Sequence, residues 1–229
     1  FISNKNMFES LLSGILFHGI YLGGVFFSVS KGLPTGITAL IVTLQPILTN
    51  ILAGPVLNEN VTWKQWIGIF FGFFGAILVL GYDAGSKFPM IGVVAAFISL
   101  FSVTAATLWQ KKISSNLPLP VSNMYQAIGG FSFHIIIVLL FEKSFINFTS
   151  TFIIAMSHQI FLISFGAFSI LMFLLDKGSA SKTVTLFFLV PPVTAIMAWV
   201  FLDEFLSLID IAGLLITTLG VYIATHKKI

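Results

Sequence analysis

The chain has 229 residues, of which 57% are hydrophobic and only 8% are charged, and its mean hydropathy is +1.05. Water-soluble domains carry about 25% charged residues, so this composition excludes a soluble globular protein and indicates an integral membrane protein. The net charge of +3 comes from lysines near the ends of apolar segments, which excludes a basic patch for nucleic acid. Because the sequence has no cysteine, disulfides, thiolate nucleophiles and cysteine-based metal sites are also excluded.

Eight apolar segments are long enough, at about 20 residues, to cross a bilayer as helices. Turn-forming connections separate them, and residues 142–157 are expected to be the longest of these connections. The sequence therefore predicts an all-α integral membrane protein. In chain order, its predicted helices cover residues 10–29, 35–56, 66–82, 90–110, 121–141, 158–175, 183–202 and 208–225.

The lysines predict the orientation of these helices, because connections on the cytoplasmic side are enriched in basic residues. Eight lysines lie in alternate connections that share one side of the membrane with the C-terminus. Only Lys31, Lys87 and Lys143 lie on the other side. We therefore expect a multi-pass protein of the inner membrane with a cytoplasmic C-terminus.

Two parts of the chain share one pattern at a constant shift of 145 positions. Each copy follows an apolar stretch with proline, and five crossings separate the two stretches, so the copies have opposite directions across the membrane. Inverted repeats of this kind are typical of secondary transporters. The matched positions are Glu59, Thr62, Gln65, Gly68 and Gly75 in the first copy and Glu204, Ser207, Asp210, Gly213 and Gly220 in the second.

The repeat divides the chain into two units. Residues 1–83 form a first unit with three helices, and residues 88–226 form a second unit with five. The first unit lacks counterparts of the first two helices of the second. We therefore expect about 55 further residues upstream, and a complete protein of two inverted five-helix repeats.

With these motifs, the chain resembles the EamA-like group of the drug/metabolite transporter superfamily. The resemblance runs from Gly32 to Gly75, through Pro46 and Glu59, and again from Gly178 to Gly220. It implies a polytopic inner-membrane carrier, most often an exporter of amino acids or related metabolites. It leaves the substrate open.

Polar side chains inside the spans are the candidates for substrate contacts, because an unpaired polar group in hydrocarbon costs about 1 kcal/mol or more. Gln45 and Asn50 rank first because they flank Pro46. An intramembrane histidine either couples transport to protons or bonds to a neighbouring helix. The candidates are His18, Tyr21, Gln45, Asn50, Ser102, Gln126, His134 and Trp199.

Three prolines predict breaks in helices. Pro46, Pro191 and Pro192 lie at corresponding places of the two repeats, where a proline removes a backbone hydrogen bond. The freed carbonyl groups either face a cavity that opens and closes, or the break is a static kink. Both interpretations remain open.

The charged and glycine positions of the repeat are expected to be structural. Glu59 and Glu204 lie at helix ends, and the pairs Thr62–Gln65 and Ser207–Asp210 have the spacing of a capping box. The repeated glycines either pack helices of one chain together or form a homodimer interface.

No motif indicates catalysis, a cofactor or a metal site, so the sequence does not predict an enzyme. It predicts a secondary transporter that exports a small neutral or zwitterionic, amino-acid-like metabolite by alternating access. Its partners are that metabolite and the lipid bilayer, without nucleic acid. The alternatives are a carrier of nucleotide sugars or drugs, and a membrane assembly subunit that does not transport. Mid-span acids would favour a cationic drug and mid-span bases a nucleotide, and the sequence has neither.

Overall fold

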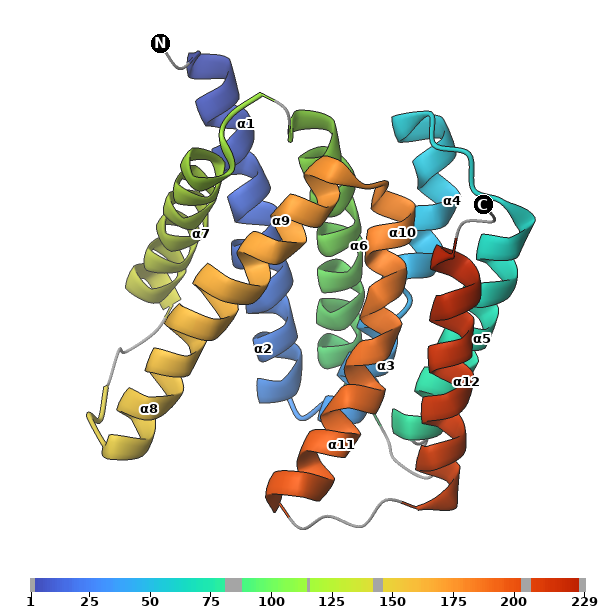
Figure 1. Cartoon of the computed structure of the whole chain (residues 1–229). Coiled ribbons are helices and arrows are strands. Elements are labelled where there is room, and N and C mark those ends of the chain that lie inside the picture. Colours follow the sequence, from blue (N-terminus) through green and yellow to red (C-terminus); the bar gives the residue numbers. More distant parts are fainter. Residues whose placement is uncertain (1–2, 81–87, 115, 142–145, 203–206, 227–229) are drawn as a thin grey trace.

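In the computed structural model, the chain forms a bundle of helices with roughly parallel axes, and the connections lie at the two ends of the bundle (Figure 1). The structure describes residues 3–80, 88–114, 116–141, 146–202 and 207–226. Within these ranges, eight helical spans are long and apolar enough to cross a membrane, and no strand occurs. This confirms the predicted all-helical class and the predicted number of spans.

The spans follow one another up and down through the bundle, and several consist of joined helices. The first contains α1 (Asn4–Gly14), the π-helix η1 (Ile15–Leu22) and α2 (Gly23–Ser30). The next three are α3 (Thr35–Val42) with α4 (Gln45–Leu57), then α5 (Trp63–Leu80), then α6 (Met90–Ile113). The fifth and sixth are α7 (Leu119–Phe141), and α8 (Ser150–His158) with the π-helix η2 (Gln159–Ala167) and α9 (Phe168–Lys177). The last two are α10 (Ala180–Thr185) with the 3-10 helix η3 (Leu186–Leu189) and α11 (Val190–Leu202), and α12 (Leu208–Thr225).

One end of the bundle carries the start of α1, the end of α12 and the connections α4–α5, α6–α7 and α9–α10; it is at the top of Figure 1. Lys5, Lys64, Lys112 and Lys177 lie at this end, which we call the lysine-rich end. The ends of α2, α5, α7 and α11 and the starts of α3, α6, α8 and α12 lie at the opposite end. The alternation therefore places these lysines on one side of the membrane.

Several of the predicted spans begin too late, the first and the sixth by the most. The first begins at Asn4 rather than near residue 10, and the sixth begins at Ser150 rather than at residue 158. The prediction that residues 142–157 form one long polar connection is therefore wrong for residues 150–157. The helix begins here because the Thr149 hydroxyl accepts the backbone N–H of Phe152 at 3.1 Å and caps the first turn. The residues from Phe152 to Met156 are apolar, so they extend the sixth span toward its start.

Helix α6 is the centre of the bundle. It is buried over 61% of its most apolar stretch, whereas the other spans are buried over 11–44%. We call residues 1–83 the first half of the chain and residues 88–226 the second half. Small side chains such as Ala95, Ala96 and Ala106 let helices of both halves approach the backbone of α6. Its neighbours are α1, α2, α3, α4, α9, α10 and η1.

Helices α5 and α12 pack against each other in antiparallel directions through four glycines, which we call the glycine seam: Gly68, Gly75, Gly213 and Gly220. A Cβ atom on Gly213 would lie 2.8 Å from the carbonyl oxygen of Gly75, and one on Gly220 would lie 2.7 Å from that of Gly68. The backbones are therefore so close that only glycine fits. The structure uses these glycines to pack helices of one chain together.

Helix boundaries in the two halves of the chain correspond. Helices α3 and α10, α4 and α11, and α5 and α12 begin 145 positions apart, as Thr35 and Ala180 illustrate. The two π-helices lie at nearly corresponding places, since η1 begins at Ile15 and η2 at Gln159. Pro46 and Pro191 are both the second residue of a helix, α4 and α11. Helix α4 follows a turn at Thr43 and Leu44, whereas α11 follows the 3-10 helix η3 directly. Each proline therefore lies where its span changes from one helical segment to the next.

Candidate functional site

The break before α4 brings Gln45 against the central helix. Its Nε2 donates a hydrogen bond of 3.0 Å to Oγ1 of Thr107 on α6, and both side chains are buried. Thr107 Oγ1 in turn donates to the carbonyl of Val103 at 2.8 Å. Gln45 therefore connects the broken span of the first half to the first helix of the second half through neutral polar groups.

Asn50, slightly more than one turn further along α4, has different neighbours. Its Nδ2 donates to the Pro46 carbonyl at 2.7 Å and approaches the Ser181 carbonyl at 3.5 Å. Its Oδ1 accepts the hydroxyl of Ser181. The Asn50 amide is thus occupied by protein groups, and it does not share a partner with Gln45.

Gln126 belongs to a separate buried cluster between α1, α6 and α7. Its Nε2 donates to Oε1 of Gln110 at 3.1 Å and to the hydroxyl of Ser122 at 3.2 Å. Ser13 donates to the same Gln110 oxygen at 3.1 Å. Nε2 of Gln110 is buried without a hydrogen-bond partner. Gln110 is thus a further polar residue of the core, which the sequence places too close to the lysines of α6 to stand out.

The remaining mid-span candidates lie where η1 meets α6 and α7. A ring nitrogen of His134 lies 2.8 Å from the carbonyl oxygen of His18, and the hydroxyl of Ser102 donates to the Leu16 carbonyl at 2.9 Å. Tyr21 packs on the apolar cluster that contains Phe17. His18 and Tyr21 belong to η1, and Ser102 and His134 bond to its backbone. The structure thus gathers these four residues around η1, apart from the partners of Gln45 and Asn50.

Trp199 lies apart from all of these groups. Its side chain is 54% exposed on α11, whereas the two prolines at the start of that helix, Pro191 and Pro192, are buried. It does not form a wall beside Gln45 in this structure.

The helix-end residues of the repeat form capping contacts. At the start of α5, Oε1 of Gln65 accepts the backbone N–H of Thr62 at 2.8 Å, and Thr62 Oγ1 accepts that of Gln65 at 3.3 Å. Ser207 and Asp210 form the same reciprocal pair at α12, with distances of 2.8 and 3.2 Å. Glu204 lies outside the described residues.

Glu59 has a role that its place at a helix end does not suggest. Its two carboxylate oxygens accept the backbone N–H groups of Ala180 and Ser181 at 2.9 and 3.1 Å. Glu59 therefore joins the first half of the chain to α10 in the second half. The sequence gives little warning of this contact, because the predicted seventh helix begins at residue 183, after both partners.

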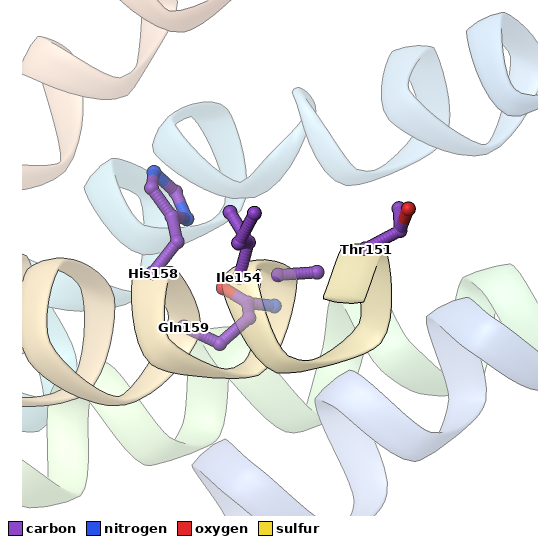
Figure 2. Close-up of a pocket in the computed structure, with 5 residues that line it drawn as sticks. Thr151, Ile154, His158 and Gln159 are labelled. Carbon is purple, nitrogen blue, oxygen red and sulfur yellow. The ribbon is translucent and has the colours of Figure 1, made fainter. Parts of the chain in front are cut away.

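A shallow, open hollow lies on the surface of α8 and the first residue of η2, toward the end of the bundle that is opposite the lysine-rich end (Figure 2). It is lined by residues of one face of this helix, and all of them are exposed. None is among the predicted site residues, although polar residues at intervals of seven and eight positions in an apolar span are a recognisable signal. The lining residues are Thr151, Ile154, Ala155, His158 and Gln159.

Inside the spans these groups are amides, hydroxyls and imidazoles, whereas the carboxylates of Glu59 and Asp210 lie at helix ends. Among the described residues, no three histidine or carboxylate side chains are placed to hold a metal ion. The arrangement can exchange hydrogen bonds with a polar solute inside the membrane, and it joins helices of the two halves at several depths.

Comparisons with known proteins agree with this architecture. A solved crystal structure that shares 14% sequence identity superposes with a TM-score of 0.76, over 96% of this chain and 86% of that one, so the two have the same fold. The uncharacterized transporter YvbV of Bacillus subtilis is 27% identical over 96% of this chain and 71% of its own length. Probable amino-acid metabolite efflux pumps of Salmonella typhimurium and Escherichia coli are 25% and 26% identical, over 87% of this chain and 70% of their own lengths.

The relatives are thus named as transporters or efflux pumps, not as enzymes. A family model matches the chain in two stretches, residues 2–81 and 90–225, which together cover nearly all of it. The description of that model is the EamA-like transporter family. This chain is a multi-pass membrane transporter that belongs to the EamA-like transporter family.

Proposed function

We propose that this transporter exports a small neutral or zwitterionic metabolite, similar to an amino acid, by alternating access across the inner membrane. The names of the Salmonella and Escherichia coli relatives support this class of cargo. The distribution of lysines supports a cytoplasmic C-terminus, since the lysine-rich end then faces the cytoplasm.

The observation that carries the proposal is the buried pair Gln45–Thr107 at a break in a span. An amide and a hydroxyl can each donate and accept hydrogen bonds, so they suit the ammonium and carboxylate groups of a zwitterion equally. In the described spans, lysine, aspartate and glutamate lie within two turns of a span end. The middle of the membrane therefore offers no fixed charge to a strongly cationic or anionic cargo.

Alternating access needs two halves that move against each other around a central site. The hydrogen bond from Gln45 to Thr107 lies between the halves, where a moving cargo would exchange hydrogen bonds with both. Small buried side chains of α6, such as Ala106 next to Thr107 in the sequence, allow neighbouring helices to slide without large barriers. We therefore place the cargo next to Gln45, with Thr107 as its neighbour on α6.

The test is release of metabolites from proteoliposomes that are preloaded with a cell extract. We expect selective loss of amino-acid-like compounds relative to empty liposomes, and a reduced rate in Gln45→Ala with normal membrane insertion. Thr43→Ala is the matched control, because the Thr43 hydroxyl donates its hydrogen bond to the Ala39 carbonyl of its own span, at 2.7 Å, and not to another span. Equal rates in Gln45→Ala and Thr43→Ala would remove Gln45 from the site.

The cargo alternatives give different results in the same assay. Selective loss of nucleotide sugars or of drug-like compounds would reassign the cargo within the superfamily. If no compound leaves, even under imposed pH and sodium gradients, the proposal of export is wrong and a non-transport assembly subunit becomes the better interpretation.

A further inference from the structure

A carboxylate of the first half is bonded to the backbone of the second half at the lysine-rich end. Glu59 is half-buried, and its two oxygens accept two successive N–H groups, of Ala180 at 2.9 Å and of Ser181 at 3.1 Å. A carboxylate suits this position because it has two acceptor oxygens and no donor. A glutamine would present an NH₂ group to one of the two donors.

Ser181 is the centre of this contact. Its hydroxyl donates a hydrogen bond to Oδ1 of Asn50 and accepts one of 3.0 Å from Nε2 of Gln65. Both of these residues belong to the first half. The side chains of Asn50, Gln65 and Ser181 are buried. We call the set of Asn50, Glu59, Gln65, Ala180 and Ser181 the latch. It links the α4–α5 connection to the start of α10 by several hydrogen bonds at once.

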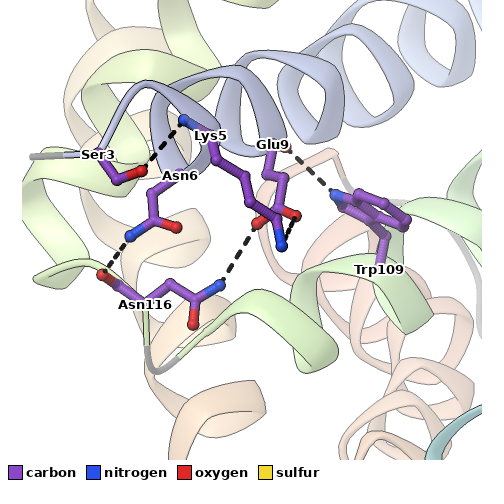
Figure 3. A network of polar contacts seen from close by, with 6 residues as sticks. All are labelled: Ser3, Lys5, Asn6, Glu9, Trp109 and Asn116. Atoms are coloured by element: carbon purple, nitrogen blue, oxygen red, sulfur yellow. Dashed lines mark hydrogen bonds and ion pairs between the residues drawn. The ribbon is translucent and has the colours of Figure 1, made fainter.

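A second set of contacts joins the halves at the same end (Figure 3). Asn6 donates to the carbonyl of Asn116 at 3.2 Å, and Asn116 donates to the Glu9 carboxylate at 3.4 Å. The indole N–H of Trp109 donates to the Glu9 carbonyl at 3.3 Å. The start of α1 is therefore fastened to the connection between α6 and α7.

The hollow on α8 lies at the other end of the molecule. Its first lining residue is Thr151, the second residue of that helix. Figure 1 shows α8 at this end, with α9 crossing toward the lysine-rich end. His158 and Gln159 are exposed in this hollow, within an apolar span. Polar side chains in a membrane span are costly toward lipid, so this face is suited to water. The polar contacts of the latch thus join the halves at the lysine-rich end, and the hollow at the other end lies on a single helical span.

We propose that the latch is the gate of the lysine-rich end, and that it must open in each transport cycle. The proposal rests on the alternating-access function proposed above. In the structure the gate is closed. Opening it separates Glu59 from α10 and exposes two backbone N–H groups and the Ser181 hydroxyl to water, which can replace the lost hydrogen bonds. Breaking the latch by mutation therefore shifts the equilibrium toward the state that is open at the lysine-rich end.

The absence of cysteine makes the test direct, because spin labels can be attached without removing native residues. Lys64→Cys and Lys112→Cys place one exposed label on each half at the lysine-rich end. Double electron–electron resonance on this pair in liposomes then measures the distance between the halves. In Glu59→Gln and Ser181→Ala we expect the ratio of long-distance to short-distance populations to rise about tenfold.

Asp210→Asn is the matched control. Its carboxylate also accepts a backbone N–H at a helix start, at 2.8 Å, but from Ser207 within the same half. We expect this variant to keep the parent distances. Glu59→Asp retains the charge and both acceptor oxygens, and it serves as a second variant where Glu59→Gln folds poorly. We expect its short-distance population to lie between those of the parent and of Glu59→Gln.

Parent-like distances in both Glu59→Gln and Ser181→Ala would overturn the proposal. An equal shift in Asp210→Asn would also overturn it, since the change would then follow from general helix destabilisation. The distance measurement needs no cargo, so its result is independent of the release assay. A shift without any release would contradict the export function but not the latch, and release with unchanged distances would contradict only the latch.

Discussion

The glycine seam between α5 and α12 makes a quantitative prediction for Gly75→Ala. The new Cβ atom would lie 2.6 Å from both the Gly213 carbonyl oxygen and the Thr217 backbone nitrogen. It would also overlap the Thr217 hydroxyl. A side chain can rotate away from such an overlap, but two backbone atoms of a helix cannot, so the whole helix must move.

The size of the movement follows from these distances. Ordinary contacts of Cβ atoms begin at 3.4 Å, so α12 has to retreat by about 0.8 Å. A gap of 0.5–1 Å forfeits roughly a quarter to a half of the dispersion energy of each contact that it opens. Excess volume in a packed interior typically costs about 1–3 kcal/mol, and we expect a loss of about 2 kcal/mol in the free energy of unfolding.

Equilibrium unfolding in mixed micelles of dodecyl maltoside and SDS measures this loss. Gly166→Ala is the control, because its Cβ atom would meet only the Phe161 carbonyl oxygen at 3.5 Å, an ordinary contact. We expect the control to be neutral or slightly stabilising, since alanine favours helix formation over glycine. Equal unfolding free energies of Gly75→Ala and Gly166→Ala would refute the close-packed seam.

Two further substitutions test the polar interior and a helix start. Gln126→Leu removes the hydrogen bonds that the Gln126 amide donates to Gln110 and Ser122, and we expect the loss of these two bonds to lower the unfolding free energy by about 1–3 kcal/mol in the same micelle titration. Parent-like stability would show that the cluster is not needed. Ser207→Ala removes the cap that Asp210 completes, and we expect a cost of about 0.5–2 kcal/mol with faster amide exchange in the first turn of α12. Unchanged exchange there would contradict the role of the cap.

The eight spans are predictable because the bilayer imposes a length and an apolar composition on each of them. Their ends are less predictable. The first turn at Ala180 contains Ser181, Lys182 and Thr183, and hydropathy does not separate such a polar turn from a loop. The late prediction at Ala180 also hid Ser181, so the partner of Glu59 could not be recognised from the sequence.

Candidate polar residues are easy to find in an apolar chain, but their partners are not. The sequence identifies Gln45 and Asn50 as neighbours of Pro46, and the structure shows that they contact different helices, α6 and α10. The direction of a side chain depends on which face of its helix meets which neighbour, and this depends on long-range packing. The hollow on α8 could not be predicted for the same reason. Whether its five lining residues face a neighbouring helix or the outside depends on where that span lies in the bundle.

The glycine seam also bears on how the protein is made. Helix α12 begins 145 positions after α5, so ribosomes that synthesise 5–20 residues per second supply the partner of α5 only after roughly 7–30 s. During this interval the glycine face of α5 is in the membrane without its final neighbour. We therefore expect α5 to be held by lipid or by the insertion machinery until α12 arrives. A nascent chain that stops before Gly213 would leave the first half of the molecule unfinished, and a quality-control protease could recognise it by that bare glycine face.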